Sequence, residues 1–492
     1  MSLDFNPQDV RIPTTHMIGG RPVSGLGPQV AVHRPSDLLP YASIEDGGAE
    51  AVGRSVEAAK AGLSASRWSK VPPRERARVL YKWAELIEQN APELARLESL
   101  GSTRPIAETA VRDVPRTAGV IRYYAEFCDK TEGTITSTEA GVFSLVRREP
   151  YGIVGAIVPW NFPMITAAWK FAPALAAGNA VVIKTSEFTP FSLIRLAELA
   201  SEAGLPSGLF NVVNGLGASS GLAIVRHPDI AKISFTGSTA TGARIMSEAA
   251  QAGIKPVTLE LGGKSPQLVF ADHGDIDRVA DFVTRGFVGN AGQVCTAGSR
   301  LVVQSSIADE FIERVMAKTR GFSAGPTWRA ATTLPPLLNA RQFERVDGLV
   351  RETVEQGARI LTGGQRLEVR SEGFFYAPTL LDGVTLEMPG YLQEFFGPVL
   401  TIQRFEDVDE GIAACAHPSY GLAASVYTRD LGKAMRAAER IEAGMVWVNH
   451  HGRAPEFTFP AGGFKSSGFG KDMGRAGIES FLREKAIWID YA

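Results

Sequence analysis

The chain has few cysteines, no large excess of either charge and no long uninterrupted apolar segment. Its 492 residues include three cysteines, Cys128, Cys295 and Cys415, which are too few and too scattered for a disulfide framework or a zinc site. The formal net charge is -2, so no basic field would attract nucleic acid or an anionic membrane. We therefore expect no metal site, no nucleic-acid partner and no membrane partner.

Residues 151–183 are apolar overall, but Pro159, Pro163, Lys170 and Pro173 interrupt them. This pattern indicates buried strands and helices rather than a membrane span. The first residues lack a basic segment followed by an apolar one, so we expect no secretory signal. Together with the scarcity of cysteine, these absences predict a soluble, cytoplasmic protein.

Strand-like apolar runs alternate with helical patterns through most of the chain. Such alternation predicts an α/β fold with parallel sheets covered by helices, of the nucleotide-binding type. Residues 130–150 differ, because they are rich in Thr and Ser and alternate like a hairpin. The expected strands are 152–158, 180–183, 210–213, 233–235, 257–260, 267–270, 445–449 and 486–491, and the expected helices include 106–127, 165–175, 190–203, 219–226, 239–250, 276–286, 307–319, 341–356 and 475–482.

Cys295 lies in a run of small residues between an amphipathic segment and an apolar one. Gly289, Gly292 and Gly298 leave little side-chain bulk around the sulfur. A substrate carbon and a cofactor ring could approach it closely, and backbone N–H groups could face an oxyanion. A buried cysteine with no chemical role fits the same run. The run alone leaves the nucleophile and the core residue equally open.

Glu260 lies at the end of a predicted strand, and Asn161 follows another. A carboxylate at the apolar strand end of Glu260 either pairs with Lys264 or acquires a raised pKa that suits a general base. The Asn161 amide could donate to an oxyanion together with the backbone N–H of Cys295. An Asx turn before Pro163 is the simpler interpretation of Asn161 taken alone.

Lys184 and Glu187 come directly after a predicted strand, at the edge where doubly wound sheets bind ligands. The two side chains could hydrogen-bond the two hydroxyls of a ribose. Taken alone, the segment fits a helix start better, with Ser186 or Thr189 as the cap and Glu187 favoured by the helix dipole.

Two further segments after strands could bind phosphate. Residues 215–221 read GxGxxxG, a weak match to the dinucleotide fingerprint. Residues 235–239 open a helix and offer the Ser238 hydroxyl. Either segment could be a turn with a helix cap, but their occurrence after adjacent strands favours a phosphate site.

Together these segments resemble the aldehyde dehydrogenase superfamily over nearly the whole chain. The Glu and Cys motifs are the most specific of them. The motifs follow the family's order and spacing: Pro159-Trp-Asn-Phe-Pro163, Lys184-Thr-Ser-Glu187, Phe235-Thr-Gly-Ser-Thr239, Glu260-Leu-Gly-Gly-Lys264, Gly292-Gln-Val-Cys295, Glu394-Phe-Phe-Gly-Pro398 and Gly462-Gly-Phe-Lys-Ser-Ser-Gly468.

The resemblance implies a role for each matching residue. Cys295 would be the nucleophile, Glu260 the general base and Asn161 the oxyanion donor, with NAD rather than NADP as cofactor. Lys184 and Glu187 would hold the adenosine ribose. The implied cofactor-binding residues are Ile157, Val158, Pro159, Trp160, Lys184, Ser186, Glu187, Gly217, Gly221, Phe235, Thr236, Gly237, Ser238, Leu261, Glu394 and Phe396. The implied substrate-lining residues are Phe162, Thr166, Trp169, Arg285, Gly289, Thr296 and Ala461.

The resemblance also implies a division into domains and an assembly. Residues 1–129 and 150–259 would form the NAD-binding domain, and residues 260–449 the catalytic domain. Residues 450–477 would form an active-site loop region that returns to the cofactor domain. Residues 130–149 and 478–492 would form an oligomerisation arm, which implies a homodimer or homotetramer.

The expected reaction is oxidation of an aldehyde to the carboxylic acid through a thiohemiacetal and a thioester. Transfer of the acyl group to coenzyme A is one alternative, although those relatives commonly lack the general-base Glu. A non-catalytic structural protein on the same fold is another. The presence of Cys295, Glu260 and Asn161 together disfavours it.

Three departures from the family's commonest pattern bear on this expectation. Thr185 replaces a usual Pro, which has little consequence. Arg475 stands where an acid is often found, so a proton relay through that position is not expected. Relatives acting on small aliphatic aldehydes often carry aromatic residues at the positions of Arg285, Gly289 and Ala461. Their loss here favours a bulky aromatic or extended aldehyde.

Polar and cationic residues of the later loop could also face the substrate. They are His450, His451, Arg453 and Arg475. If they point inward, they favour an aldehyde with an acidic group. Solvated arginines, with Phe457 or Phe459 refilling the space, are the alternative.

Overall fold

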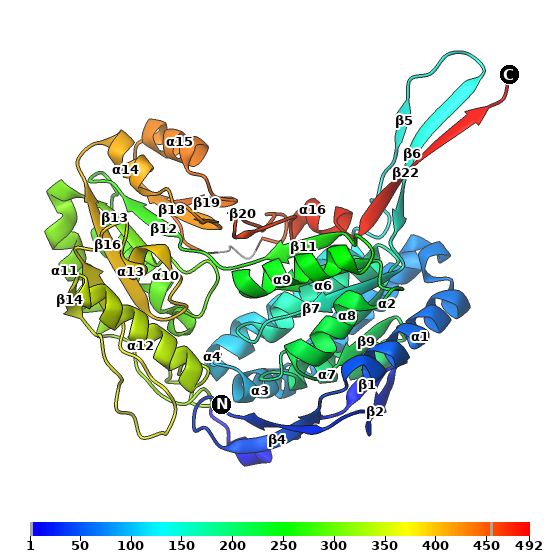
Figure 1. Cartoon of the computed structure of the whole chain (residues 1–492), viewed down its shortest axis with the longest axis horizontal. Coiled ribbons are helices and arrows are strands. Elements are labelled where there is room, and N and C mark those ends of the chain that lie inside the picture. Colours follow the sequence, from blue (N-terminus) through cyan, green and yellow to red (C-terminus); the bar gives the residue numbers. More distant parts are fainter. Residues whose placement is uncertain (1–2, 453–455) are drawn as a thin grey trace.

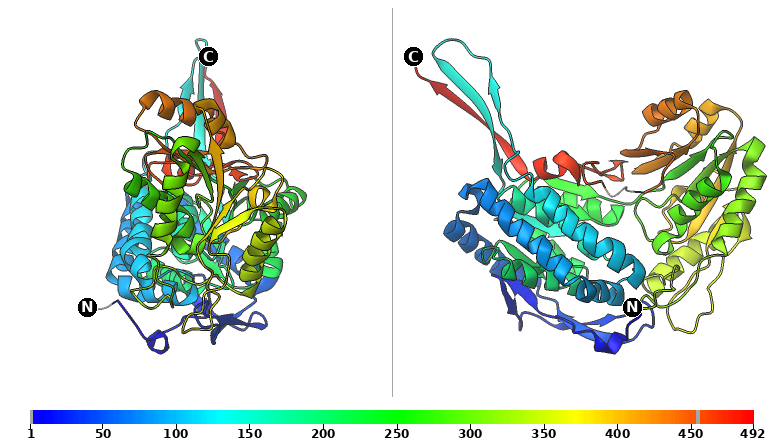
Figure 2. Two further views of the ribbon diagram at one scale, coloured as in Figure 1. Left: turned by 90° about the vertical axis from the view of Figure 1, so that its left-hand side faces the viewer. Right: turned by 180° about the vertical axis from the view of Figure 1, so that it is seen from behind.

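The computed structural model describes residues 3–452 and 456–492, which form two α/β parts and a projecting arm (Figure 1). Each α/β part is built on one sheet with helices on its faces. The arm leaves the larger part and extends into solvent (Figure 2). The expected fold class is therefore confirmed, including the β arm.

The first sheet has eight strands in the order β2-β1-β9-β8-β7-β10-β11-β21. From β7 the chain moves outward to β8 and β9 on one side, and then to β10 and β11 on the other, with all five strands parallel. The order reverses between β7 and β10, and ligands bind at such a reversal. The strands are β1 (His16–Ile18), β2 (Arg21–Val23), β7 (Ile153–Ile157), β8 (Ala180–Lys184), β9 (Phe210–Val213), β10 (Lys232–Thr236), β11 (Val257–Glu260) and β21 (Gly468–Phe469).

Helix α6 (Pro163–Ala176) lies at the centre of this part, and all 14 of its residues are buried. Its sequence is apolar on every side, as expected of a helix enclosed by neighbours. Trp83 stacks on Phe171 of α6 with ring centroids 4.8 Å apart. The other helices here are α1 (Gly48–Ser66), α2 (Pro73–Gln89), α3 (Ala91–Gly101), α4 (Ile106–Glu108), α5 (Val114–Ala125), α7 (Phe191–Glu202), α8 (Leu222–Arg226), α9 (Thr239–Gln251) and α16 (Gly474–Glu479).

The second sheet has seven strands in the order β14-β15-β16-β13-β12-β18-β19. All neighbours are parallel except β14, which runs antiparallel along one edge. The strands are β12 (Pro266–Val269), β13 (Arg300–Gln304), β14 (Arg359–Thr362), β15 (Thr379–Asp382), β16 (Val399–Phe405), β18 (Ala423–Tyr427) and β19 (Met445–Val448). The helices are α10 (Ile276–Val288), α11 (Ala308–Thr319), α12 (Ala340–Glu355), α13 (Pro389–Leu392), α14 (Val408–Ala414) and α15 (Leu431–Arg440).

Three strands make the arm: β5 (Thr134–Thr136), β6 (Val142–Pro150) and β22 (Leu482–Asp490). β6 and β22 are paired along all nine residues. Apolar side chains are exposed on the arm, among them Ile135 at 71% and Trp488 at 65%. In addition, β3 (Gln29–His33) pairs with β4 (Pro40–Glu45), and β17 (Tyr420–Gly421) with β20 (Phe464–Lys465).

Most predicted elements are confirmed within a few residues, with two differences. The helix expected from residue 106 to 127 is divided by a π-helical turn, Thr109–Asp113, between α4 and α5. The cap expected at Ser186 or Thr189 is wrong, because α7 begins only after Pro190. No helix in the described part of the chain is long and apolar enough to cross a membrane.

Candidate active site

A cleft of about 1550 Å³ lies beside the carboxyl ends of β7 and β10. The segments that follow these strands line one wall, and the cysteine loop lines another. The predicted site residues along it are Pro159, Trp160, Asn161, Phe162, Thr166, Trp169, Thr236, Gly237, Ser238, Leu261, Arg285, Gly289, Cys295, Thr296, Glu394 and Phe396. Among the described residues, the lining does not include Ile157, Val158, Lys184, Ser186, Glu187, Gly217, Gly221, Phe235, Glu260 or Ala461.

The loop before Cys295 has an unusual backbone. Asn290 and Ala291 adopt left-handed conformations, with φ of 52° and 51°. Gly292 follows with φ of 70°, and a Cβ there would lie 2.0 Å from the Gly397 carbonyl oxygen. This compact turn brings α10 to an end and presents Cys295 to the cleft.

The three cysteines differ in exposure. Cys295 is partly exposed in the cleft, whereas Cys128 and Cys415 are buried. Burial raises the pKa of Cys128 to about 11 and that of Cys415 to about 12. Because the thiolate is the nucleophilic form, these two thiols are poorly suited to react.

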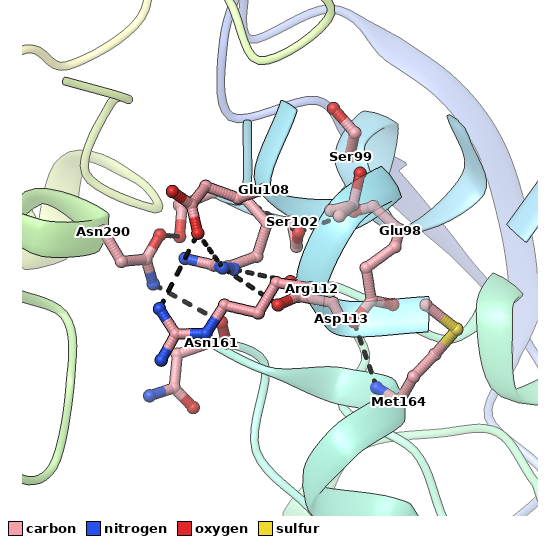
Figure 3. A network of polar contacts seen from close by, with 12 residues as sticks. Glu98, Ser99, Ser102, Glu108, Arg112, Asp113, Asn161, Met164 and Asn290 are labelled. Atoms are coloured by element: carbon pink, nitrogen blue, oxygen red, sulfur yellow. Dashed lines mark hydrogen bonds and ion pairs between the residues drawn. The ribbon is translucent and has the colours of Figure 1, made fainter. Parts of the chain in front are cut away.

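Asn161 and the cysteine loop are joined by amide hydrogen bonds (Figure 3). The Asn161 Nδ2 donates to the Gln293 carbonyl over 2.9 Å. The Asn290 Nδ2 donates to the same carbonyl over 3.3 Å and to the Asn161 carbonyl over 3.4 Å. Since a side-chain amide has two N–H donors, Asn161 keeps one for another acceptor.

Glu260 ends β11 and is 6% exposed. A Cβ on Gly462 would lie 2.8 Å from its Oε1, so the carboxylate packs against the segment after residue 461. The Lys471 ammonium acts electrostatically on Glu260. Lys264 is buried over the Phe395 ring, 3.8 Å from its centroid, so a surface pair with Lys264 is not the role of Glu260.

Glu394 projects over the glycines that follow β11. Its Oε1 accepts from the Gly263 N–H over 3.1 Å. A Cβ on Gly262 would lie 2.2 Å from its Oε2, so only glycine admits the carboxylate there. Burial raises the pKa of Glu394 to about 7.

The remaining predicted cofactor residues lie around the same end of the first sheet. Lys184 and Glu187 form an ion pair at 2.8 Å. Ser238 caps α9, accepting from the Thr241 N–H over 3.3 Å. The loop at Gly217 was expected to offer donors to a phosphate. In the structure, the Asp46 carboxylate accepts from the Leu216 N–H over 3.0 Å and from the Ser219 hydroxyl.

The substrate side of the cleft is open at one predicted position. A Cβ on Gly289 would have no described atom within 4 Å. Phe162 and Trp169 supply aromatic surface, and Phe282 of α10 adds more. Phe457 instead packs towards Gly119, where a Cβ would lie 2.5 Å from its ring.

The cationic residues of the cleft are not those of the later loop. Arg112 and Arg116, near the π-helical turn, line the cleft together with Arg285. Arg285 is 73% exposed and pairs with Asp281 at 2.8 Å. Arg475 pairs with Glu132 and Glu479.

Of the two histidines of that loop, His451 faces the cleft and His450 packs on an aromatic ring. His451 lines the cleft, but burial lowers its pKa to about 4, which leaves it neutral at pH 7. His450 contacts the Phe282 ring edge-on at 5.4 Å. Arg453 lies outside the described residues.

Two residues were missed from the sequence: Arg104, which lines the cleft, and Gln293, which is buried in the cysteine loop. Gln293 stood inside a quoted motif, and its side chain donates to the Asn290 and Pro336 carbonyls. Arg104 forms a two-bond contact with Asp113, at 2.7 and 3.0 Å, and lies 4.4 Å from the Phe162 ring. No local pattern marks Arg104, because its partners come from folding.

Comparisons with known proteins agree with this geometry. The model of the Aldehyde dehydrogenase family matches residues 23–487. The chain is 40% identical over 457 residues to the NADP/NAD-dependent aldehyde dehydrogenase PuuC of Escherichia coli (strain K12), covering 92% of this chain and 91% of that protein. It is also 40% identical over 458 residues to an aldehyde dehydrogenase of Alternaria alternata, covering 93% and 91%.

Solved structures are similar over nearly the full length. An indole-3-acetaldehyde dehydrogenase complexed with NAD+ superposes with a TM-score of 0.96 at 37% identity, covering 98% of each chain. A gamma-glutamyl-gamma-aminobutyraldehyde dehydrogenase from Burkholderia cenocepacia gives a TM-score of 0.96 at 39% identity, covering 99% of this chain and 98% of that one.

Proposed function

Because the chain belongs to the aldehyde dehydrogenase family, we propose that it oxidises its aldehyde by covalent catalysis at Cys295. The observation that carries the proposal is the presence of Cys295, Asn161 and Glu394 along one cleft at the strand-order reversal. Of the three thiols, Cys295 alone combines exposure to this cleft with a loop of small residues.

The Cys295 thiolate attacks the aldehyde carbon and forms a thiohemiacetal. The free N–H of the Asn161 amide and the backbone N–H of Cys295 stabilise the oxyanion that develops. NAD, held by Glu394, Ser238 and the Lys184–Glu187 pair, would supply the acceptor for the hydride of that carbon, and the acyl group would then remain on the Cys295 sulfur as a thioester. Glu260 takes a proton from water, whose oxygen attacks the thioester; the carbon–sulfur bond breaks, which releases the carboxylic acid and returns Cys295 as the thiolate, and Glu260 passes its proton to solvent.

The cofactor residues fit a dinucleotide with ribose hydroxyls at two places. The Glu394 carboxylate, admitted by Gly262, would accept from the hydroxyls of the nicotinamide ribose. Ser238 at the start of α9 would hold a phosphate, with the helix dipole in its favour. The Lys184–Glu187 pair would hold the adenosine ribose, and the Glu187 carboxylate would disfavour a 2′-phosphate.

The preferred substrate is a bulky aromatic or extended aldehyde rather than acetaldehyde. The open space beside Gly289 and the aromatic surfaces of Phe162 and Trp169 support this proposal. Two similar structures are named for indole-3-acetaldehyde and for gamma-glutamyl-gamma-aminobutyraldehyde. Both of these aldehydes carry large substituents. Arg112 and Arg116 favour an acidic group at the far end.

The test is NADH formation with a panel of acetaldehyde, hexanal, benzaldehyde, indole-3-acetaldehyde and a carboxylated semialdehyde. One missing contact of methylene size changes kcat/KM by about 10–200-fold, so a preference for large aldehydes will be clear. Cys295→Ala should abolish NADH formation and leave NAD binding intact, while Cys128→Ala should retain activity. Preference for acetaldehyde would refute the substrate class, and an active Cys295→Ala variant would refute the nucleophile.

NAD should exceed NADP in kcat/KM, and equal values would contradict the proposed role of Glu187.

The arm is proposed to join copies of the chain into a dimer or tetramer. Its nine-residue β6–β22 pairing makes it stiff enough to project, and exposed Ile135 and Trp488 give it apolar surface to bury.

A further inference from the structure

We propose that Thr103 is a positioning residue for the reaction: through Asn290, its hydroxyl fixes the orientation of the oxyanion donor Asn161. Thr103 lies between α3 and α4, 187 residues before Asn290. It is fully buried. The inference rests on the proposed function of Asn161.

The first contact in the series from Thr103 to Asn161 sets the direction in which the Asn290 amide faces. The Thr103 Oγ1 donates to the Asn290 Oδ1 over 3.0 Å. With its oxygen held there, Asn290 turns its Nδ2 towards the other side, because the amide oxygen and nitrogen lie at opposite ends of one planar group. Asn290 is itself only 5% exposed, so water is a poor substitute for the hydroxyl.

The second contact joins the loop to the oxyanion donor. The Asn290 Nδ2 lies 3.4 Å from the Asn161 carbonyl and 3.3 Å from the Gln293 carbonyl. The Gln293 carbonyl also accepts from the Asn161 Nδ2 over 2.9 Å. One Asn290 amide therefore fixes both the backbone of Asn161 and the acceptor that aligns its side chain, as Figure 3 shows for Asn290 and Asn161.

The acceptor is rigid as well. The Gln293 side chain donates to the Pro336 carbonyl over 3.1 Å and accepts from the Leu338 N–H over 2.9 Å. Asn290 has φ of 52°, a conformation that side-chain contacts must stabilise. The Thr103 hydroxyl is the outer end of this series of contacts, and Thr103 is not among the described residues that line the cleft.

Loss of the hydroxyl leaves the Asn290 Oδ1 buried without this donor, so the amide is held only by its Nδ2 contacts to the two carbonyls. An amide held at one end moves more freely, and Asn161 loses alignment with it. Complete removal of an oxyanion donor costs about 10²–10³-fold in rate. Loss of its support should cost less, about tenfold in the rate of the first NADH burst.

The test compares Thr103→Val, which removes the hydroxyl at constant shape, with Thr103→Ser, which retains it. Thr103→Val should lower the burst rate about tenfold without changing the dissociation constant of NAD. Thr103→Ser should restore the burst to within about twofold of the wild type. Thr109→Val is the matched control, since Thr109 is also fully buried nearby but bonds to the Ala95 and Ile106 carbonyls.

A double-mutant cycle separates positioning from general loosening. In an Asn161→Ala background, Thr103→Val should change the burst rate by less than about twofold, because the group through which it acts is gone. If the burst rate of the double variant is lowered by the product of the two single effects, the inference is overturned. An unchanged burst rate in Thr103→Val would overturn it as well. If Thr103→Val does not fold, Thr103→Ala is measured against the same expectations.

The two proposals fail in different ways. A wild-type protein that forms no NADH with any aldehyde of the panel refutes the proposed function, and this inference with it. An active wild type with an unaffected Thr103→Val variant refutes the inference alone.

Discussion

Replacing the buried carboxyl of Glu98 by an amide should make the stability of the region around α3 and α6 less sensitive to high pH. Glu98 lies on α3, 2% exposed, and its side chain points towards Met164 at the start of α6 (Figure 3). It accepts from the Met164 N–H over 3.0 Å and from the Ser192 hydroxyl over 2.5 Å. Burial raises the pKa of Glu98 to about 8, although these two donors act against the rise.

The size of the effect follows from the difference between the folded and unfolded chain. An unfolded Glu titrates near 4.5, so the folded state binds one more proton between about pH 4.5 and 8. The contribution of the Glu98 carboxyl to the free energy of unfolding is therefore fully present below about pH 4.5. It decreases above that pH and is lost once the pH has risen through 8. At about 1.4 kcal/mol per pH unit, the total loss is about 5 kcal/mol, of which about 3 kcal/mol falls between pH 6 and 9.

Hydrogen exchange of peptides from α6 measures this loss where Glu98 contacts the helix. Wild type and Glu98→Gln are compared at the same pH, so that intrinsic exchange rates cancel. The ratio of wild-type to Glu98→Gln exchange rates at pH 6 is the reference. At pH 9 this ratio should be larger by up to about a hundredfold, the equivalent of about 3 kcal/mol.

Glu93→Gln provides the matched control, because Glu93 lies on the same helix but pairs with Arg195 at the surface. Its ratio to the wild type should not change between pH 6 and 9. If the ratio for Glu98→Gln is also the same at both pH values, the carboxyl does not ionise in this range and the reasoning is refuted.

Two further predictions concern the reaction. Glu260→Gln should give a normal first burst of NADH followed by a steady state slower by about 10²–10⁴-fold, because only thioester hydrolysis needs the base; an unchanged steady state would exclude that role. The dissociation constant of NAD should fall by up to about tenfold from pH 6 to 8, because the pKa of Glu394 is about 7 and the ionised carboxylate accepts from the ribose. Glu394→Gln should lose this dependence, and a flat profile in the wild type would contradict it.

The fold could be predicted largely because its elements follow local patterns. Apolar runs such as 180–183 and 210–213 become adjacent strands, and α9 begins at the capping Ser238 as expected. The order of the strands in the first sheet could not be predicted in the same way, because β1 and β21 join that sheet from distant parts of the chain. The π-helical turn at Thr109 likewise has no periodic signal strong enough to separate it from the helix around it.

The candidate site was predictable where a residue and its neighbours in sequence supply the chemistry. Cys295 among glycines is such a case, because it lies along the cleft, whereas Glu260 stays a prediction and is not among the described lining residues. Thr103 and Arg104 are not such cases, since each acts on a residue that only folding brings near. Asp46 shows the same limit from the other side, because a glycine-rich loop gives no warning that a distant carboxylate has taken its donors.

The pairing in the arm has a consequence for synthesis of the chain. Lys485 of β22 forms an ion pair with Glu149 of β6, 336 residues earlier. While the intervening residues are being translated, β6 has only the three-residue β5 beside it and presents an open edge. An open edge with exposed apolar side chains is prone to pair with another nascent chain. The arm can therefore be completed only after residues 482–490 have been translated, and chaperone protection of residues 142–150 would matter most before β22 leaves the ribosome.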